Sequence, residues 1–305
     1  MIVGVMLHPA IGIRPATAGD FEAIERIAAA NDEATTAPSW PGYLYLEHLL
    51  TAGTLCVAVR GGVVVGYAGA MVVGGRRPAA HVTDLFVDPG AQGRGVGSRL
   101  LKALMAVIDV PDWTTSSSAD PRALTLYARA GMVPLWPVLY VDAPLGAELV
   151  ERRQDVAVTA VAAEAAAGFE LRWSGRDFSV HYRHWAARPG ATVFRVELAG
   201  RTAAVGIVRE GRLAAGRTID HLAVAPSADP GGTLLAALSS AVVRGPEAGA
   251  GGDAQARLRL AVPGPNPALP YLLALGFRIL DQDTFCASDS GLVDPLRVVP
   301  DPSFG

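Results

Sequence analysis

A glycine-rich stretch holds the residues whose types and spacing could do chemistry. Residues 85–98 have the sequence LFVDPGAQGRGVGS, between an expected strand at 81–87 and an expected helix at 97–110. Glycines at a strand-to-helix turn let several backbone N–H groups point at one spot. There they join the unpaired N–H groups and the positive dipole end of the helix. We therefore expect an anion site that needs no lysine and that lets a diphosphate come close to the backbone.

Two common phosphate-binding patterns do not fit this stretch. A Walker loop needs a Gly-Lys pair, and the only lysine, Lys102, lies inside the expected helix. The dinucleotide pattern GxGxxG fails from either possible starting glycine, because its sixth position is then Ser98 or Leu100. The stretch is therefore neither of these loops.

Residues 92–97, with the pattern Gln-x-x-Gly-x-Gly, resemble the (Gln/Arg)-x-x-Gly-x-(Gly/Ala) pyrophosphate motif of the GNAT superfamily of N-acetyltransferases. A second signature follows at 120–132, DPRALTLYARAGM, which is similar to the family's Asn-x-x-Ala-x-x-Leu-Tyr-x-Arg-x-Gly-Phe. Both signatures occur in the family's order and spacing. The resemblance covers about residues 11–141 well and 155–305 more loosely, as in tandem GNAT proteins.

The resemblance implies that acetyl-CoA is the co-substrate and that a substrate amine attacks its acetyl carbon directly in a ternary complex. Tyr127 stands where the family's tyrosine reaches the thioester sulfur, so it is the candidate acid. Asp120 stands where the family favours asparagine, and it could cap the helix or contact the cofactor. The expected cofactor-binding residues are Phe86, Val87, Asp88, Gln92, Gly93, Arg94, Gly95, Val96, Gly97, Ser98 and Asp120.

The general base is harder to assign from sequence. Many family members place an acidic side chain on the strand before the loop, and Asp84 is the matching residue here. His81, with an ordinary pKa near neutrality, is a second candidate on the same strand. The segment that usually covers the acceptor site in this family holds several further polar and aromatic residues, any of which could instead be solvated or part of the core. They are Asp32, Glu33, Trp40, Tyr43 and Tyr45.

Composition limits the class of protein. Half of the 305 residues are hydrophobic and 18% are charged, which suits packed cores. The formal net charge of -3 gives no basic field, so nucleic acid is not an expected partner. Cys56 and Cys286 lack metal-type spacing and are expected to be small buried hydrophobes. With no signal peptide or membrane span in the pattern, we expect a cytoplasmic monomer or homodimer without a membrane partner.

The order strand, hairpin, strand, loop, helix, strand, helix, glycine, strand occurs twice along the chain, with hairpins at Gly61-Gly62 and Gly200-Arg201. We therefore predict an α/β (α+β) fold with two tandem GNAT-like domains, residues 1–145 and 153–305. Each would be a twisted, mostly antiparallel sheet flanked by helices. The first sheet would splay beside the strand at 81–87, where pantetheine could bond to exposed strand backbone.

The second half departs from the cofactor motif. Residues 225–234 are APSADPGGTL, and an alignment on Pro89 and Pro226 puts Asp229 where Gln92 stands and Leu234 where Gly97 stands. An aspartate repels a diphosphate, so we expect a degenerate cofactor loop here. The expected function is acetyl transfer to a small-molecule amine by the first half. The alternative is a non-catalytic acyl-CoA-binding sensor, favoured by the lack of an obvious glutamate base.

Overall fold

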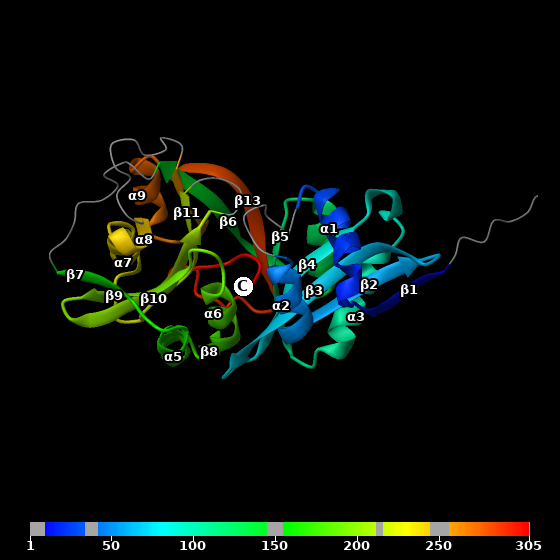
Figure 1. Cartoon of the computed structure of the whole chain (residues 1–305), viewed down its shortest axis with the longest axis horizontal. Coiled ribbons are helices and arrows are strands. Elements are labelled where there is room, and N and C mark those ends of the chain that lie inside the picture. The colour runs from blue at the N-terminus through cyan, green and yellow to red at the C-terminus, as the bar shows by residue number, and fades with distance from the viewer. Residues whose placement is uncertain (1–9, 34–41, 145–154, 212–215, 245–255, 305) are drawn as a thin grey trace, which may run out of the picture. The chain divides into compact units, whose positions relative to one another are not determined.

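A computed structural model describes residues 10–33, 42–144, 155–211, 216–244 and 256–304 (Figure 1). Backbone contacts group these residues into two compact units. Unit 1 holds the described residues up to Met71 together with Val82–Asp109, and unit 2 holds Val72–His81 and the described residues from Val110 onward. The predicted boundary between residues 145 and 153 falls outside the described residues, so the two predicted domains stay a prediction.

Unit 1 is built on antiparallel strands. Strand β1 pairs with β2, and β2 pairs with β3, which lies next to β4. The β2–β3 hairpin turns at Gly61 and Gly62, whose φ angles of 58° and 83° lie in the left-handed region that glycine adopts at little cost. The strands are β1 (Ile11–Pro15), β2 (Thr54–Arg60), β3 (Val63–Gly75) and β4 (Ala79–Val87), and the last two continue into unit 2.

Helices cover both faces of this sheet. Gly66 and Gly69 on β3 point to opposite faces. A Cβ at Gly66 would lie 3.3 Å from the Val96 side chain, and one at Gly69 would lie 3.0 Å from the Leu49 side chain. One face is therefore covered by α3 and the other by α2. The helices of unit 1 are α1 (Phe21–Ala29), α2 (Leu44–Ala52) and α3 (Val96–Val107), with 3-10 turns η1 (Ala18–Asp20) and η2 (Pro89–Ala91).

Unit 2 contains a longer sheet in which the neighbouring strands are β5-β13-β6-β12-β11-β10-β9-β7. Every described pairing along this path is antiparallel except that of β11 with β12. The strands are β5 (Asp112–Ser117), β6 (Val133–Pro144), β7 (Val156–Ala160), β8 (Arg176–Asp177), β9 (Thr192–Leu198), β10 (Arg201–Glu210), β11 (Gly216–Val224), β12 (Arg257–Pro263), β13 (Arg278–Ala287) and β14 (Val298–Val299).

Unit 2 contains two helices that the repeat order expected from sequence does not include. They are α5 (Ala163–Ser174) and α6 (Ser179–Ala186), and they pack against each other. Helix α6 buries Tyr182 and Trp185 completely although its sequence, SVHYRHWA, is largely polar or amphipathic. The remaining helices are α4 (Pro121–Arg129), α7 (Pro230–Leu238), α8 (Ala241–Arg244) and α9 (Leu269–Ala274).

The last strands of the two sequence repeats are exchanged. The segment after Gly131 is a single strand, β6. Strand β6 pairs with β12 of the second repeat, and β13 of the second repeat lies between β5 and β6 of the first (Figure 1). The two repeats therefore share one sheet within unit 2.

The predicted α/β (α+β) class, with mostly antiparallel sheets flanked by helices, is confirmed. Cys56 and Cys286 are both free and buried, as expected, and burial raises the pKa of each thiol to about 11. Among the described helices, none has both the length and the apolar character needed to cross a membrane.

Candidate active site

The loop between β4 and α3 begins at Asp88, whose hydrogen bonds hold the first residues of the loop in place. The Asp88 N–H donates to Val65 O at 3.0 Å, and its Oδ1 accepts from the Gly90 N–H at 2.9 Å. The Arg26 guanidinium on α1 donates to Asp88 Oδ2 at 2.9 Å and lowers the pKa of that carboxyl. Asp88 therefore shapes the turn, and its expected contact with the cofactor stays a prediction. Arg26 was not predicted from sequence.

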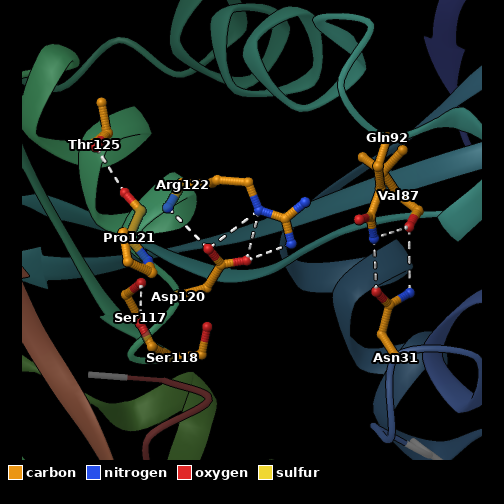
Figure 2. Close-up of polar contacts among 9 residues, drawn as sticks. All are labelled: Asn31, Val87, Gln92, Ser117, Ser118, Asp120, Pro121, Arg122 and Thr125. Atoms are coloured by element: carbon orange, nitrogen blue, oxygen red, sulfur yellow. Dashed lines mark hydrogen bonds and ion pairs between the residues drawn. The ribbon is translucent and has the colours of Figure 1, made fainter.

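The Gln92 side chain holds the loop against the end of α1 (Figure 2). Its Nε2 donates to Val87 O at 3.1 Å and to Asn31 Oδ1 at 3.2 Å. Asn31 in turn donates to Val87 O at 3.3 Å and to Ile27 O at 2.8 Å. This network fixes the backbone of the cofactor motif, so the amide of Gln92 acts on the loop.

The next residues form an open cradle at the start of α3. Gly93 and Gly95 have φ angles of 73° and 75°, and a Cβ built on either would meet no atom within 4 Å. Gly95 is the N-cap and provides no side-chain cap, and the first helical bond runs from the Arg99 N–H to Gly95 O at 3.2 Å. The N–H groups ahead of Arg99 have no partner within the helix because of helix geometry. An open backbone turn at an uncapped helix start suits an anionic diphosphate.

The other predicted residues of this loop contribute in different ways. The Val96 side chain is buried under β3, so only its N–H could face a ligand. Arg94 is exposed, while Gly97 and Ser98 are half-buried in the first turn of α3. Phe86 on β4 packs on Tyr67, with ring centroids 5.7 Å apart.

Asp84 is a buried carboxyl on β4, only 9% exposed. Its Oδ2 accepts hydrogen bonds from the Thr83 hydroxyl at 2.9 Å and from the Tyr45 hydroxyl on α2. Burial raises the pKa of Asp84 to about 6, against the opposing effect of these two donors. A Cβ at Gly69 would lie 3.5 Å from Asp84 Oδ2, which places the carboxyl on the α2 side of the sheet. Such a group can accept a proton near neutral pH.

The residues of the segment that is expected to cover the acceptor site have different surroundings in the structure. Tyr45 contacts Asp84 directly, whereas Tyr43 packs on Phe21 with ring centroids 5.2 Å apart. Asp32 has a left-handed φ of 63°, and the Glu33 N–H donates to Ala28 O at 2.8 Å, so both belong to the turn that ends α1. Trp40 lies outside the described residues.

His81 does not have the geometry of a base. It is fully buried, with Nδ1 2.9 Å from the Thr114 hydroxyl and Nε2 3.0 Å from Pro302 O. A carbonyl only accepts, so Nε2 carries the hydrogen and the Thr114 hydroxyl donates to Nδ1. Burial lowers the pKa of His81 to about 4. Both nitrogens are thus engaged inside unit 2.

The second signature forms helix α4 of unit 2. Asp120 is its N-cap, accepting from the Arg122 N–H at 2.8 Å and pairing with the Arg122 guanidinium at 2.7 Å (Figure 2). Of the two roles open from sequence, capping is the one this geometry provides. Tyr127 is 6% exposed, and its carbonyl accepts from the Met132 N–H at 3.0 Å at the helix end. Its predicted role as acid stays a prediction.

In the second repeat, the helix that follows the corresponding loop is capped by a side chain of that loop. Asp229 is the N-cap of α7, and its Oδ2 accepts from the Gly232 N–H at 2.6 Å. It therefore takes the helix position of Gly95, which corrects the sequence alignment of Asp229 with Gln92. The loop is shorter than the one before α3, and a carboxylate stands where the first repeat has an open glycine.

Comparisons with known proteins agree with this geometry. Residues 21–132 match the acetyltransferase (GNAT) family. A stretch of 68 residues is 40% identical to the N-alpha-acetyltransferase RimI of Mycobacterium tuberculosis, and it covers 22% of this chain and 43% of that protein. The chain thus spans less than half the length of this relative.

Two solved structures share the fold over nearly the whole chain. A putative acetyltransferase from Pyrococcus horikoshii matches with a TM-score of 0.71 and 16% identity, covering 97% of this chain and 96% of that one. A tandem GNAT protein from the clavulanic acid biosynthesis pathway matches with a TM-score of 0.60 and 18% identity, covering 93% and 100%. Residues 21–132 therefore match a GNAT domain, and the chain shares the fold of both solved structures, one of which is a tandem GNAT protein.

Proposed function

We propose that this protein is an acetyl-CoA-dependent N-acetyltransferase whose donor site is the β4–α3 loop of unit 1. The observation that carries the proposal is the open, uncapped glycine turn at the start of α3, directly after a strand that bears the buried carboxyl of Asp84. An anion-binding turn and a group able to accept a proton are the two parts that acetyl transfer to an amine needs.

The backbone of residues 93–98 would hold the diphosphate of acetyl-CoA, which supplies an activated acetyl carbon. Gln92, Asp88 and Arg26 keep this loop in place. Asp120 acts as a helix cap in this scheme. The β4 strand backbone beside Phe86 and Val87 is the proposed pantetheine contact.

In the proposed reaction, Asp84 takes the proton that the attacking amine releases, directly or through a water molecule. Tyr127 gives a proton to the departing thiolate, a role that rests on its place in the second signature. The proposed order is direct attack of the amine on the acetyl carbon in a ternary complex, with no covalent intermediate on either residue.

The proposed acceptor is the primary amine of a small molecule. The name of the RimI relative refers to an α-amino group, so short peptides with a free N-terminus belong among the test compounds. A buried carboxyl with a pKa near 6 weakens the main reason for preferring a non-catalytic sensor, which was the lack of an obvious base.

The test is release of free CoA from acetyl-CoA, measured with a thiol reagent over a panel of amines and peptides, beside calorimetry of acetyl-CoA binding. Amine-dependent CoA release together with binding supports the enzyme. Tight binding with no turnover for any amine would support the sensor, and no binding would reject both.

A further inference from the structure

The segment 294–304 lies against the second repeat in the places that correspond to the proposed donor site of the first. Strand β11, loop 225–229 and helix α7 follow one another in the chain as β4, loop 88–95 and α3 do in the first repeat. Strand β11 pairs with β12 only over Gly216–Ile219. Beyond that point, Leu222 and Ala223 pair with Val299 and Val298 of β14 instead.

Arg297 holds the end of this segment that lies against the loop before α7. Its Nη1 donates to Ala225 O at 2.7 Å and to Ala228 O at 2.8 Å, both in the loop before α7. In return the Val224 N–H, at the end of β11, donates to Arg297 O at 2.9 Å. The segment thus bonds to both the strand end and the loop.

Asn266 provides a third set of contacts. It precedes Pro267 and α9 as Asp120 precedes Pro121 and α4, and it is 4% exposed. Its Nδ2 lies 3.3 Å from Leu296 O and 3.4 Å from Val298 O, while its Oδ1 accepts from the Ala268 N–H. The asparagine that the family motif favours at this point is therefore directed at the protein's own chain.

The other end of the segment is linked to the middle of β11 by buried charged and aromatic side chains. Asp301 accepts from the Trp185 indole N–H at 2.9 Å and from Arg188 at 3.0 Å, and Arg188 also bonds to Asp220 of β11 at 2.6 Å. Phe304 is fully buried, with its ring 5.0 Å from that of His181. Buried contacts therefore hold this end of the segment as well.

We propose that residues 294–304 are a built-in occupant of the position in the second repeat that corresponds to the proposed donor site of the first. They bond to the strand backbone, the loop and the motif asparagine, which are the contacts that an acyl-CoA would need there. Asp229 meanwhile covers the α7 N-terminus. The second repeat therefore stays folded without a cofactor, and the chain binds a single acyl-CoA, through the first repeat.

The experiment measures hydrogen exchange of the Val224 amide and the stoichiometry of acetyl-CoA binding, on full-length variants. Arg297→Ala removes the two guanidinium bonds to the loop, so Val224 should exchange about tenfold faster than in the wild type. Asp301→Asn weakens the contacts at the other end of the segment, so it should also accelerate Val224 exchange. Arg201→Ala, at an exposed position on β10, is the matched control and should change nothing.

Gly97→Leu separates this inference from the proposed function. It should abolish acetyl-CoA binding while leaving Val224 exchange as in the wild type, and adding acetyl-CoA should leave the amide unaffected. Should Arg297→Ala fail to fold, Arg297→Lys keeps a cationic N–H donor without the guanidinium geometry and is expected to accelerate exchange by a smaller factor. Binding of a second acetyl-CoA per wild-type chain, or unchanged Val224 exchange in the folded Arg297 and Asp301 variants, would overturn the inference.

Discussion

At the scale of single residues, the surroundings of a side chain decide its chemistry more than its type does. Asp84 and Asp88 lie on one strand and its exit, yet their pKa values move in opposite directions. Burial raises the first, whereas the Arg26 guanidinium and a backbone N–H lower the second. Only Asp84 is thereby suited to exchange a proton near neutrality.

The first prediction concerns Asp84→Asn. An amide cannot accept the proton, so kcat/KM should fall by roughly 10²–10⁴-fold, the usual contribution of a general base. In the wild type, kcat/KM should fall as the pH drops through about 6, because Asp84 becomes protonated there. The residual activity of the variant should not show this fall at acidic pH. The measurement is a pH profile of CoA release.

Tyr45→Phe is the companion variant, because Tyr45 donates to Asp84 Oδ2 and that bond lowers the pKa of the carboxyl. Its loss should raise the pKa of Asp84 and move the acidic limb of the profile to higher pH, with acetyl-CoA affinity unchanged. A limb that stays in place, or that moves to lower pH, would show that Asp84 is not the titrating base.

Tyr127→Phe keeps the buried ring and removes only the hydroxyl. If Tyr127 protonates the thiolate, kcat should fall by about 10²-fold or more while the Kd for acetyl-CoA stays within a factor of about two. Steady-state kinetics and calorimetry give the two values. An unaltered kcat would remove Tyr127 as the acid.

At the scale of elements, the starts of α3 and α7 show how one loop can be open and its counterpart closed. Gly95 leaves the start of α3 without a side-chain cap, and Asp229 supplies a carboxylate cap to α7. A capping carboxylate occupies the N–H groups that an anionic ligand would use and adds negative charge at the same place.

Gly97→Leu tests the open loop. A bulky side chain in the first turn of α3 should block close approach of the diphosphate, so acetyl-CoA binding should be lost in calorimetry. Gly12→Leu is the matched control, since Gly12 is exposed on β1 and a Cβ there meets no atom within 4 Å. Retained affinity in Gly97→Leu would refute the assignment of this loop.

At the scale of the whole molecule, the sequence repeats and the folded sheet do not divide the chain in the same way. Strand β13 pairs with β5 over Thr284–Ala287, and β6 pairs with β12 over Val138–Pro144. Each repeat thus depends on the other for a neighbour of one of its own strands. An unpaired strand edge exposes backbone N–H and C=O groups and promotes aggregation.

Fragments 1–145 and 153–305, expressed separately, should therefore be insoluble or lack a cooperative thermal transition, and the two co-expressed fragments should purify together. Circular dichroism melting and size-exclusion chromatography provide the readouts. A full-length chain cleaved between residues 145 and 153 is the control and should remain assembled. Independent, cooperative melting of either fragment at the temperature of the intact chain would contradict the exchange of strands.

Several features follow from the sequence alone because they depend on local chemistry. The Gly61-Gly62 hairpin, the strand before residue 88 and the helix after residue 95 are encoded by φ preferences and by period-two or helical patterns. The glycine loop and the weakness of its second copy are visible in the same way. These features need only neighbouring residues.

Other features were decided by tertiary structure. Helix α6 buries His181, Tyr182 and Trp185, whose polar groups hide the apolar pattern on which sequence reasoning relies. The different surroundings of Asp84 and His81 depend on a partner from α2 in one case and on Thr114 and Pro302 in the other. The strand exchange and the docking of residues 294–304 join segments far apart in the chain. No local pattern encodes such pairings, because they exist only when distant backbone groups satisfy one another's hydrogen bonds.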